Sequence, residues 1–185
     1  MGLHELRCHI CIVPQNPFVF EASVRFNIDP FNEKTDEEIW EAIEKVGLKS
    51  FIQKLPHQLE EELLEGGKNM STGQQQLLCI ARALLRNCKI LICDEATANV
   101  SHEDDQLIQK IISQEFKNKT VITVAHRIHS ILSNVDKVLV MGNAKKIEYD
   151  APKVLLKDSN SSFSKVRTHA LNSSRNVSIS FLITC

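Results

Sequence analysis

The feature that most constrains the fold is an apolar run, Ile90 to Cys93, that ends in two adjacent carboxylates, Asp94 and Glu95. A short apolar run of this kind, bounded by polar residues, predicts a buried β-strand. A carboxylate at the end of a buried strand is in a setting that can tune a general base. Most such runs are ordinary core strands followed by a solvated acidic turn, so the interpretation depends on other segments of the chain.

Strands and amphipathic helices alternate along much of the sequence. A helix is predicted from Gly73 to about Asn87, and Ser101 can cap a second helix with Asp104 as its acidic partner. Strands are predicted at 7–13, 89–93, 120–125 and 137–141, the last returning in a hairpin through 145–149. This alternation predicts an α/β fold with a parallel sheet and helices on its faces.

A helical insert interrupts the alternation. Thr35 and Glu38 form a predicted capping box, and an apolar stripe at helical spacing follows it until Gly47. A second short helix is expected over 48–55. With the helix that starts at Gly73, these elements define a helical subdomain over about residues 33–88.

Composition narrows the class of protein. The 185 residues suit one domain, and 22 basic against 23 acidic residues give no reason to expect nucleic acid as a partner. No apolar stretch approaches the roughly 20 residues that span a bilayer, and no signal peptide opens the chain. We therefore expect a cytosolic chain without a membrane span of its own.

Two cysteines, Cys8 and Cys11, form a C-x-x-C pair. If both lie in one strand, their side chains point to opposite faces, and no second pair is present to complete a tetrahedral zinc site. We interpret the six cysteines as core or surface thiols.

Three further segments carry chemistry. Ser71 and Gly73 precede or open a helix, where unpaired amides and the positive end of the helix dipole favour a phosphate. His126 follows a β-branched strand, and Gln15 follows a strand and a proline. Each motif alone has an unremarkable explanation, such as a helix cap or a surface histidine. Their occurrence together in one chain, in a particular order around Asp94 and Glu95, is more informative than any one of them.

In that order, 70–74, 93–98 and 125–127 resemble the signature, Walker B and switch-histidine motifs of ATP-binding cassette (ABC) domains. The stretches 2–7, 25–32 and 36–40 look like the second nucleotide-binding domain of multidrug resistance-associated proteins, the C branch of ABC transporters. The likeness covers nearly everything from Gly2 to about Val166. It implies a P-loop NTPase fold of the ABC type and an ATPase that drives export of organic anions or conjugates.

The resemblance also implies roles for individual residues. Glu95 would polarise the attacking water, and His126 would hydrogen-bond the γ-phosphate. Asp94 would hold magnesium through water, while the amide oxygen of Gln15 would ligate magnesium or orient the water. The cofactors implied are ATP and Mg.

A second set of residues would act on a partner. By resemblance, Ser71, Gly73 and Gln74 bind the ATP of an opposing nucleotide-binding domain in a head-to-tail dimer. The transmembrane domains of the same transporter are the other implied partners. This places the domain at the cytoplasmic face of a membrane, and the plasma membrane is the expected one.

The chain departs from the family in several places. No segment fits the Walker A loop, G-x-x-x-x-G-K-[ST]; the nearest candidate, 66–69, is better explained as a Gly-Gly turn before the signature helix. The signature begins with Met70, has Thr72 in its middle and is followed by Gln75. Ser101 stands where the family has Asp, and Ala144 where it has Gly.

We accordingly expect residues 1–167 to be a partial ABC nucleotide-binding domain, with a RecA-like core outside the helical subdomain and its amino-terminal part missing. Residues 168–185 have a divergent composition, and we expect a disordered tail. The alternative is a truncated non-catalytic fragment or a module that only dimerises. DNA-repair ABC ATPases are disfavoured by the transporter-like Asn27-Ile28-Asp29-Pro30 stretch and by the lack of coiled-coil heptads.

Overall fold

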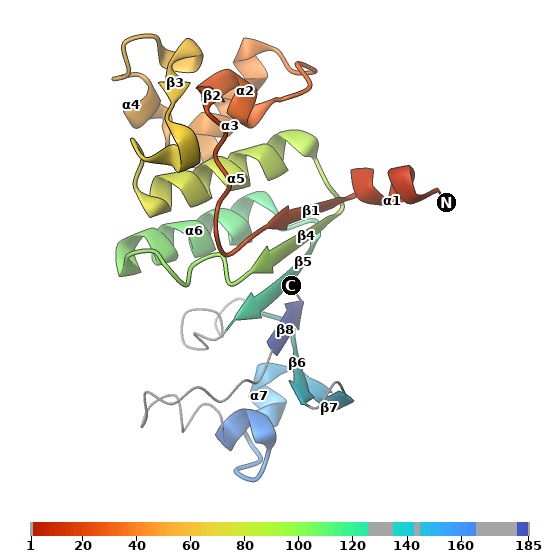
Figure 1. The fold of residues 1–185 in the computed structure, drawn as a ribbon. Helices are drawn as coiled ribbons and strands as arrows, with labels where there is room; N and C mark the ends of the chain where they lie inside the picture. The colour runs from red at the N-terminus through yellow and green to blue at the C-terminus, as the bar shows by residue number, and fades with distance from the viewer. Residues whose placement is uncertain (1, 126–134, 143–144, 166–180, 185) are drawn as a thin grey trace.

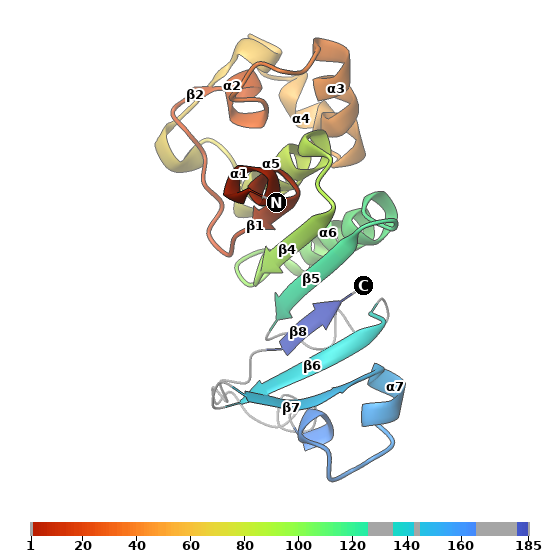
Figure 2. The ribbon, with the colours of Figure 1, turned by 90° about the vertical axis from the view of Figure 1, so that its right-hand side faces the viewer.

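A computed structural model describes residues 2–125, 135–142, 145–165 and 181–184 of the chain. Within these ranges one sheet has six strands in the order β1-β4-β5-β8-β6-β7, and Figure 2 shows them in this sequence down the molecule. Their bounds are β1 Ile10–Val13, β4 Ile90–Asp94, β5 Thr120–Ala125, β6 Lys137–Gly142, β7 Lys145–Asp150 and β8 Phe181–Thr184. The predicted α/β architecture is therefore confirmed.

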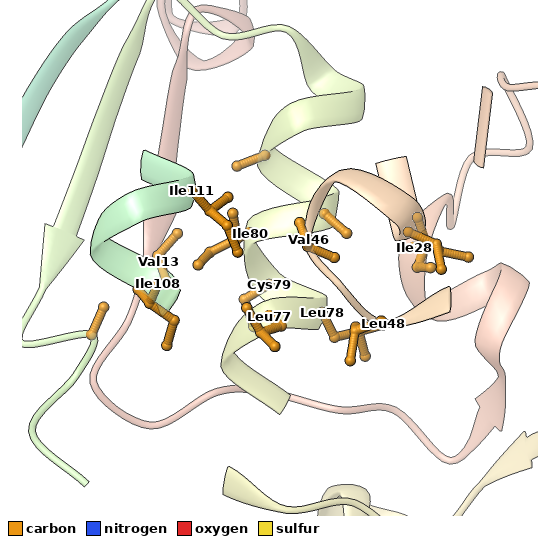
Figure 3. Packing of buried hydrophobic residues seen from close by; sticks show 14 of the residues in the cluster. Val13, Ile28, Val46, Leu48, Leu77, Leu78, Cys79, Ile80, Ile108 and Ile111 are labelled. Carbon is orange, nitrogen blue, oxygen red and sulfur yellow. The ribbon is translucent and has the colours of Figure 1, made fainter. Parts of the chain in front are cut away.

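Strands β1, β4 and β5 are parallel and in register, so residues opposite each other share a face of the sheet. Cys11, Leu91 and Val121 form one such row and are buried. Helices α5 (Thr72–Arg86) and α6 (His102–Glu115) pack on this face. Figure 3 shows Ile80 of α5 lying beside Ile111 of α6, and Ile108 of α6 near Val13 of β1.

The opposite face of these strands is less covered. Ile12, Ile92 and Ile122 form a row across β1, β4 and β5. Ile12 is 62% exposed, and the other two are only half-buried. Parallel sheets normally have both faces covered, so the described part of the chain leaves an apolar face that lacks its expected layer.

The helical part lies beyond α5 (Figure 1). It contains α2 (Val24–Ile28), α3 (Asp36–Lys45), α4 (Lys49–Ile52), the short 3₁₀ helices Gln58–Glu60 and Glu65–Gly67, and the small sheet of β2 (Ala22–Ser23) with β3 (Glu62–Leu63). The predicted capping box is confirmed, since Thr35 accepts from the Glu38 amide and Glu38 accepts from the Thr35 amide. The helix predicted over 48–55 is shorter than expected.

Two expectations from the sequence are wrong in part. Residues 7–13 are not one strand: α1 spans Leu3–Cys8, and β1 starts at Ile10, where pairing with Ile90 begins. Glu5 in the first turn and Arg7 in the last turn of α1 suit the helix dipole. Cys8 and Cys11 consequently lie on different elements, one exposed and one buried.

The tail also differs from the expectation of disorder. Phe181–Thr184 forms β8, which pairs with both β5 and β6. Backbone pairing on two sides gives this apolar segment a strand conformation that its position at the end of the chain did not suggest. Residues 166–180 lie outside the described residues.

Two more of the predicted features are confirmed. β6 and β7 form the expected antiparallel hairpin, followed by α7 (Pro152–Leu155). Ser101 caps α6: its hydroxyl accepts from the Asp104 amide and donates to the Asp104 carboxylate. Ala144, discussed above as a departure from the family, lies outside the described residues. Across the described ranges, no helix combines the length and apolar character that crossing a bilayer requires.

Candidate functional site

The carboxyl ends of the parallel strands bring three of the predicted site residues to one edge of the sheet. Val13, the last residue of β1, pairs with Cys93, and Gln15 follows two residues later. Asp94 ends β4 beside Val124 of β5. Ligands of parallel α/β sheets bind outside this edge, so Gln15, Asp94 and Glu95 stand where a nucleotide site would form.

Glu95 has an unusual backbone. Its φ is 45°, in the left-handed region that a non-glycine residue seldom adopts. Its amide donates to the carbonyl of Val124 at 3.0 Å, and its carbonyl accepts from the amide of Ala98 at 2.9 Å. The turn directly after β4 is therefore fixed to β5, which holds the half-buried Glu95 beside the exposed Asp94. His126, the other predicted catalytic residue, lies outside the described residues.

Gln76 connects the signature helix to the loop that carries Gln15. It lies on α5, is 1% exposed, and its Nε2 donates to the carbonyls of Pro14 and Gln15, each at 3.0 Å. Its Oε1 is buried and has no hydrogen-bond partner among the described residues. Gln76 was not among the residues predicted from the sequence, although an amide on the buried face of an amphipathic helix is a usable signal.

Arg82, two turns further along α5, holds the next part of the same loop. Its guanidinium donates to the backbone carbonyl of Asn27, to the carbonyl of Phe18 at 2.5 Å and to Asn27 Oδ1 at 2.9 Å. Burial lowers the pKa of Arg82. The Asn27 amide in turn donates to the carbonyls of Phe20, Ala22 and Ser23. One helix thus fixes the path of the chain from Pro14 to Asn27.

Aromatic side chains gather on the outside of this loop. Phe18 and Phe20 meet edge to face with ring centroids 4.7 Å apart, and Phe20 meets Phe26 in the same way at 5.8 Å. Phe18 is 62% exposed and the other two are 43% exposed. Large exposed apolar side chains that adjoin one another indicate a contact surface.

The start of the signature helix is built by a second capping box. Ser71 Oγ accepts from the Gln74 amide at 3.1 Å, and Gln74 Oε1 accepts from the Ser71 amide at 2.9 Å. Ser71 is exposed, Gln74 is half-buried, and Gly73 is buried. A Cβ added to Gly73 would lie 2.3 Å from Asp104 Oδ2, so the Asp104 carboxylate would have to move to admit any side chain here.

Gln75 has a structural role that its departure from the family pattern did not reveal. Its Nε2 donates to the carbonyl of Gly67 at 2.8 Å and to that of Met70 at 3.3 Å. Gly66 and Gly67 have φ of 67° and 68°. The interpretation of 66–69 as a Gly-Gly turn ahead of the helix is confirmed, because both glycines adopt a conformation that other residues avoid.

Comparison with known proteins gives a consistent result. The sequence profile of the family described as ABC transporter matches residues 2–98. ATP-binding cassette sub-family C member 4 of Homo sapiens is 49% identical over 166 residues, which are 90% of this chain and 12% of that protein. Sub-family C member 2 of Homo sapiens is 53% identical over 156 residues, which are 84% of this chain and 10% of that protein.

Among solved structures, a bacterial Atm1-family ABC exporter with ATP bound superposes with a TM-score of 0.82 at 26% identity. The match covers 92% of this chain and 30% of the exporter chain. The chain therefore spans a small part of each of these proteins, with its likeness extending over most of its own length.

Proposed function

Because the chain belongs to the ABC transporter family, we propose that it is part of the second nucleotide-binding domain of a C-branch exporter. In that role ATP binding and hydrolysis are coupled to transport across a membrane, and organic anions or conjugates are the proposed substrates. The observation that carries the proposal is the convergence of Gln15, Asp94 and Glu95 at the carboxyl edge of β1 and β4. A parallel sheet that presents acidic residues at this edge suits phosphoryl transfer.

Glu95 is the proposed base that polarises the attacking water, and His126 is proposed to stabilise the γ-phosphate charge. The left-handed turn at Glu95, tied to Val124, supports the first role because it fixes the backbone of the base. Preorganised groups of this kind lower the barrier without reorganising during the reaction.

The donor set fits magnesium. Asp94 offers an exposed carboxylate and Gln15 an amide oxygen, and magnesium prefers such oxygen ligands together with water. When bound, the ion would neutralise phosphate charge. The contribution of this chain is to hold Gln15 in place through the buried Gln76.

Ser71, Gly73 and Gln74 are proposed to act on ATP held by a second nucleotide-binding domain in a head-to-tail dimer. Ser71 is exposed at the start of α5, where free amides favour a phosphate. The exposed Phe18, Phe20 and Phe26 are proposed to contact the transmembrane domains of the same protein. The domain would then lie at the cytoplasmic face of a membrane, with the plasma membrane as the proposed one.

For the domain organisation we propose residues 1–167 as a partial nucleotide-binding domain, with about 33–88 as its helical subdomain, and 168–185 as a divergent tail whose residues Phe181–Thr184 add a strand to the sheet. A non-catalytic fragment or a dimerisation module is the second candidate. No segment of these 185 residues fits a Walker A loop, so the two candidates make different predictions for ATP binding when such a segment is added.

Calorimetry distinguishes the two candidates. The chain alone should bind Mg-ATP weakly, because the Walker A amides and lysine supply most phosphate contacts. The same chain, extended at its amino end by the Walker A segment of human sub-family C member 4, should bind ATP with micromolar affinity. If the extended chain folds but gains no affinity, the enzyme proposal fails and the non-catalytic one stands.

A further inference from the structure

Strand β8 occupies an unusual place in the sheet. It lies between β5 and β6 (Figure 2). It pairs with both strands: Leu182 is opposite Val124 on one side and Leu139 on the other. In the described sheet, β5 and β6 are separated by β8 and share no ladder of their own. The last strand in the sequence therefore joins the β6–β7 hairpin to the parallel strands.

The two strands that flank β8 run in the same direction. β8 is antiparallel to both neighbours, so β5 and β6 run in the same direction. β1, β4 and β5 are parallel as well. A strand running with β5 and β6 in this position would bring its carboxyl end to the edge where Asp94 and Glu95 lie, whereas β8 runs the opposite way.

The strand direction that this position favours bears on the proposed function, and the inference below rests on that function. A Walker A loop connects a strand to a helix. That strand must end at the same edge as Asp94, because the loop and the carboxylate act on one nucleotide. The space between β5 and β6 offers such a strand two ladders, whereas the outer edge of β1 offers one.

We propose that the gap between β5 and β6 is a strand-acceptor site, which the carboxyl-terminal segment Phe181–Thr184 occupies in place of the strand that precedes a Walker A loop. The two occupants are mutually exclusive because each needs the same backbone groups of β5 and β6. The segment Ile179-Ser180-Phe181-Leu182-Ile183-Thr184 suits the site, being uncharged and rich in residues that favour strands.

Occupation of the site has a clear physical benefit. Without β8, both β5 and β6 would present a row of unpaired backbone groups, and exposed edges of this kind promote pairing with other chains. The tail thus closes a gap that would otherwise divide the sheet into β1-β4-β5 and β6-β7.

Hydrogen exchange on the intact chain tests the proposal directly. The amides of Leu182 and Ile183 should be protected in the wild type, and fast exchange of this segment in the native chain would overturn it. Leu182→Pro removes a ladder amide, whereas Leu182→Thr keeps it. The proline variant should raise exchange in β6 by roughly tenfold or more, the threonine variant should not, and β4 should be unaffected in both.

Replacement of the occupant gives a second test. A chain truncated after Ser180 should regain protection of β6 when a synthetic peptide of residues 178–185 is added, but not with a scrambled peptide. In the chain extended by a Walker A segment, the amides of Phe181–Thr184 should lose their protection from hydrogen exchange, while the amides of β6 should stay protected. If β8 stays protected there, the two strands are not exclusive. Since no ATP is needed, this result is independent of whether the extended chain is an ATPase.

Discussion

The side-chain amide of Gln76 donates to the backbone carbonyl of Gln15 at 3.0 Å, although the two residues are 61 positions apart in the sequence. The same nitrogen also reaches the Pro14 carbonyl. Because Gln76 is buried on α5 and Ser71 caps that helix, α5 both anchors the loop with the proposed magnesium ligand Gln15 and carries the proposed partner-binding residues. A movement of α5 would carry both.

Removing the side-chain amide of Gln76 should weaken the attachment of the loop at Pro14 and Gln15 to α5. Gln76→Leu keeps an apolar side chain of similar size but leaves the carbonyls of Pro14 and Gln15 without their donor. Urea denaturation should show a loss of about 1–3 kcal/mol in the free energy of unfolding. The matched control is Gln106→Leu at an exposed position of α6, which should change stability by less than about 0.5 kcal/mol. Equal effects of the two substitutions would refute the anchoring role.

The contact between Gly73 and Asp104 predicts a coupled pair. Gly73→Ala places a methyl group 2.3 Å from Asp104 Oδ2, which should destabilise the chain by about 1–3 kcal/mol. Asp104→Ala removes the clash, so the double variant should lose less stability than the sum of the single variants. Thermal or chemical denaturation of the wild type, the two single variants and the double variant gives a double-mutant cycle. Strictly additive losses of stability would show that the contact is not made.

Two buried thiols, those of Cys11 and Cys88, should make the stability of the folded chain depend on pH. The hydrogen bond with Cys11 lowers the pKa of Cys88 to about 7, and Lys119 adds favourable charge. The same bond, followed by burial, raises the pKa of Cys11. Since the folded pKa of Cys88 is below its ordinary value of 9.0, its stabilising contribution is complete above pH 9 and is lost as the pH falls through about 7.

Cys11→Val removes the bond that is the main cause of the Cys88 shift. The stability difference between wild type and variant should therefore grow from pH 6.5 to pH 9, by on the order of 1 kcal/mol. Above pH 9 it should shrink, because Cys11 keeps its proton when folded. Cys8→Ala, at an exposed position of α1, should show no such trend. A flat difference for Cys11→Val would contradict the assignment.

The sequence predicted the order of the helices and strands well, because hydrophobic periodicity and capping residues are local signals. Thr35 with Glu38, and Ser101 with Asp104, are caps readable over four positions. Residues 7–9 were misassigned because a strand begins only where a partner exists, and the partner of Ile10 is Ile90, far along the chain. β8 was missed for the same reason, since its two neighbours lie in distant segments.

The residues of the candidate site also fall into those that local sequence patterns predict and those that depend on contacts between distant segments. Asp94, Glu95 and Gln15 were proposed as site residues because motif order and strand ends are visible in the sequence. Gln76 and the fit of Gly73 against Asp104 depend on how α5 packs on the loop and on α6, which no local pattern contains. Residues that support a site from another element are therefore the ones that sequence reasoning omits.

The two proposed roles of this chain can be separated in a complete transporter that contains it. Ser71→Arg would place a cation where the partner's γ-phosphate docks, at the exposed start of α5. Nucleotide trapped at the partner's Walker A should fall directly, and hydrolysis at the site with Glu95 only indirectly. Labelling each nucleotide-binding domain with an azido-ATP analogue shows which one loses nucleotide, and loss confined to this domain would overturn the in-trans assignment.

The most direct test of the account is the turnover of Glu95→Gln in the chain extended by a Walker A segment and paired with its partner domain. The change keeps the shape of the side chain and removes the base, so hydrolysis should fall by 10²-fold or more, on the order of a general-base contribution, while ATP binding is kept. Glu60→Gln, at an exposed position of the helical part, serves as the control and should leave turnover unchanged. Hydrolysis in Glu95→Gln equal to that of the control would show that Glu95 is not the base.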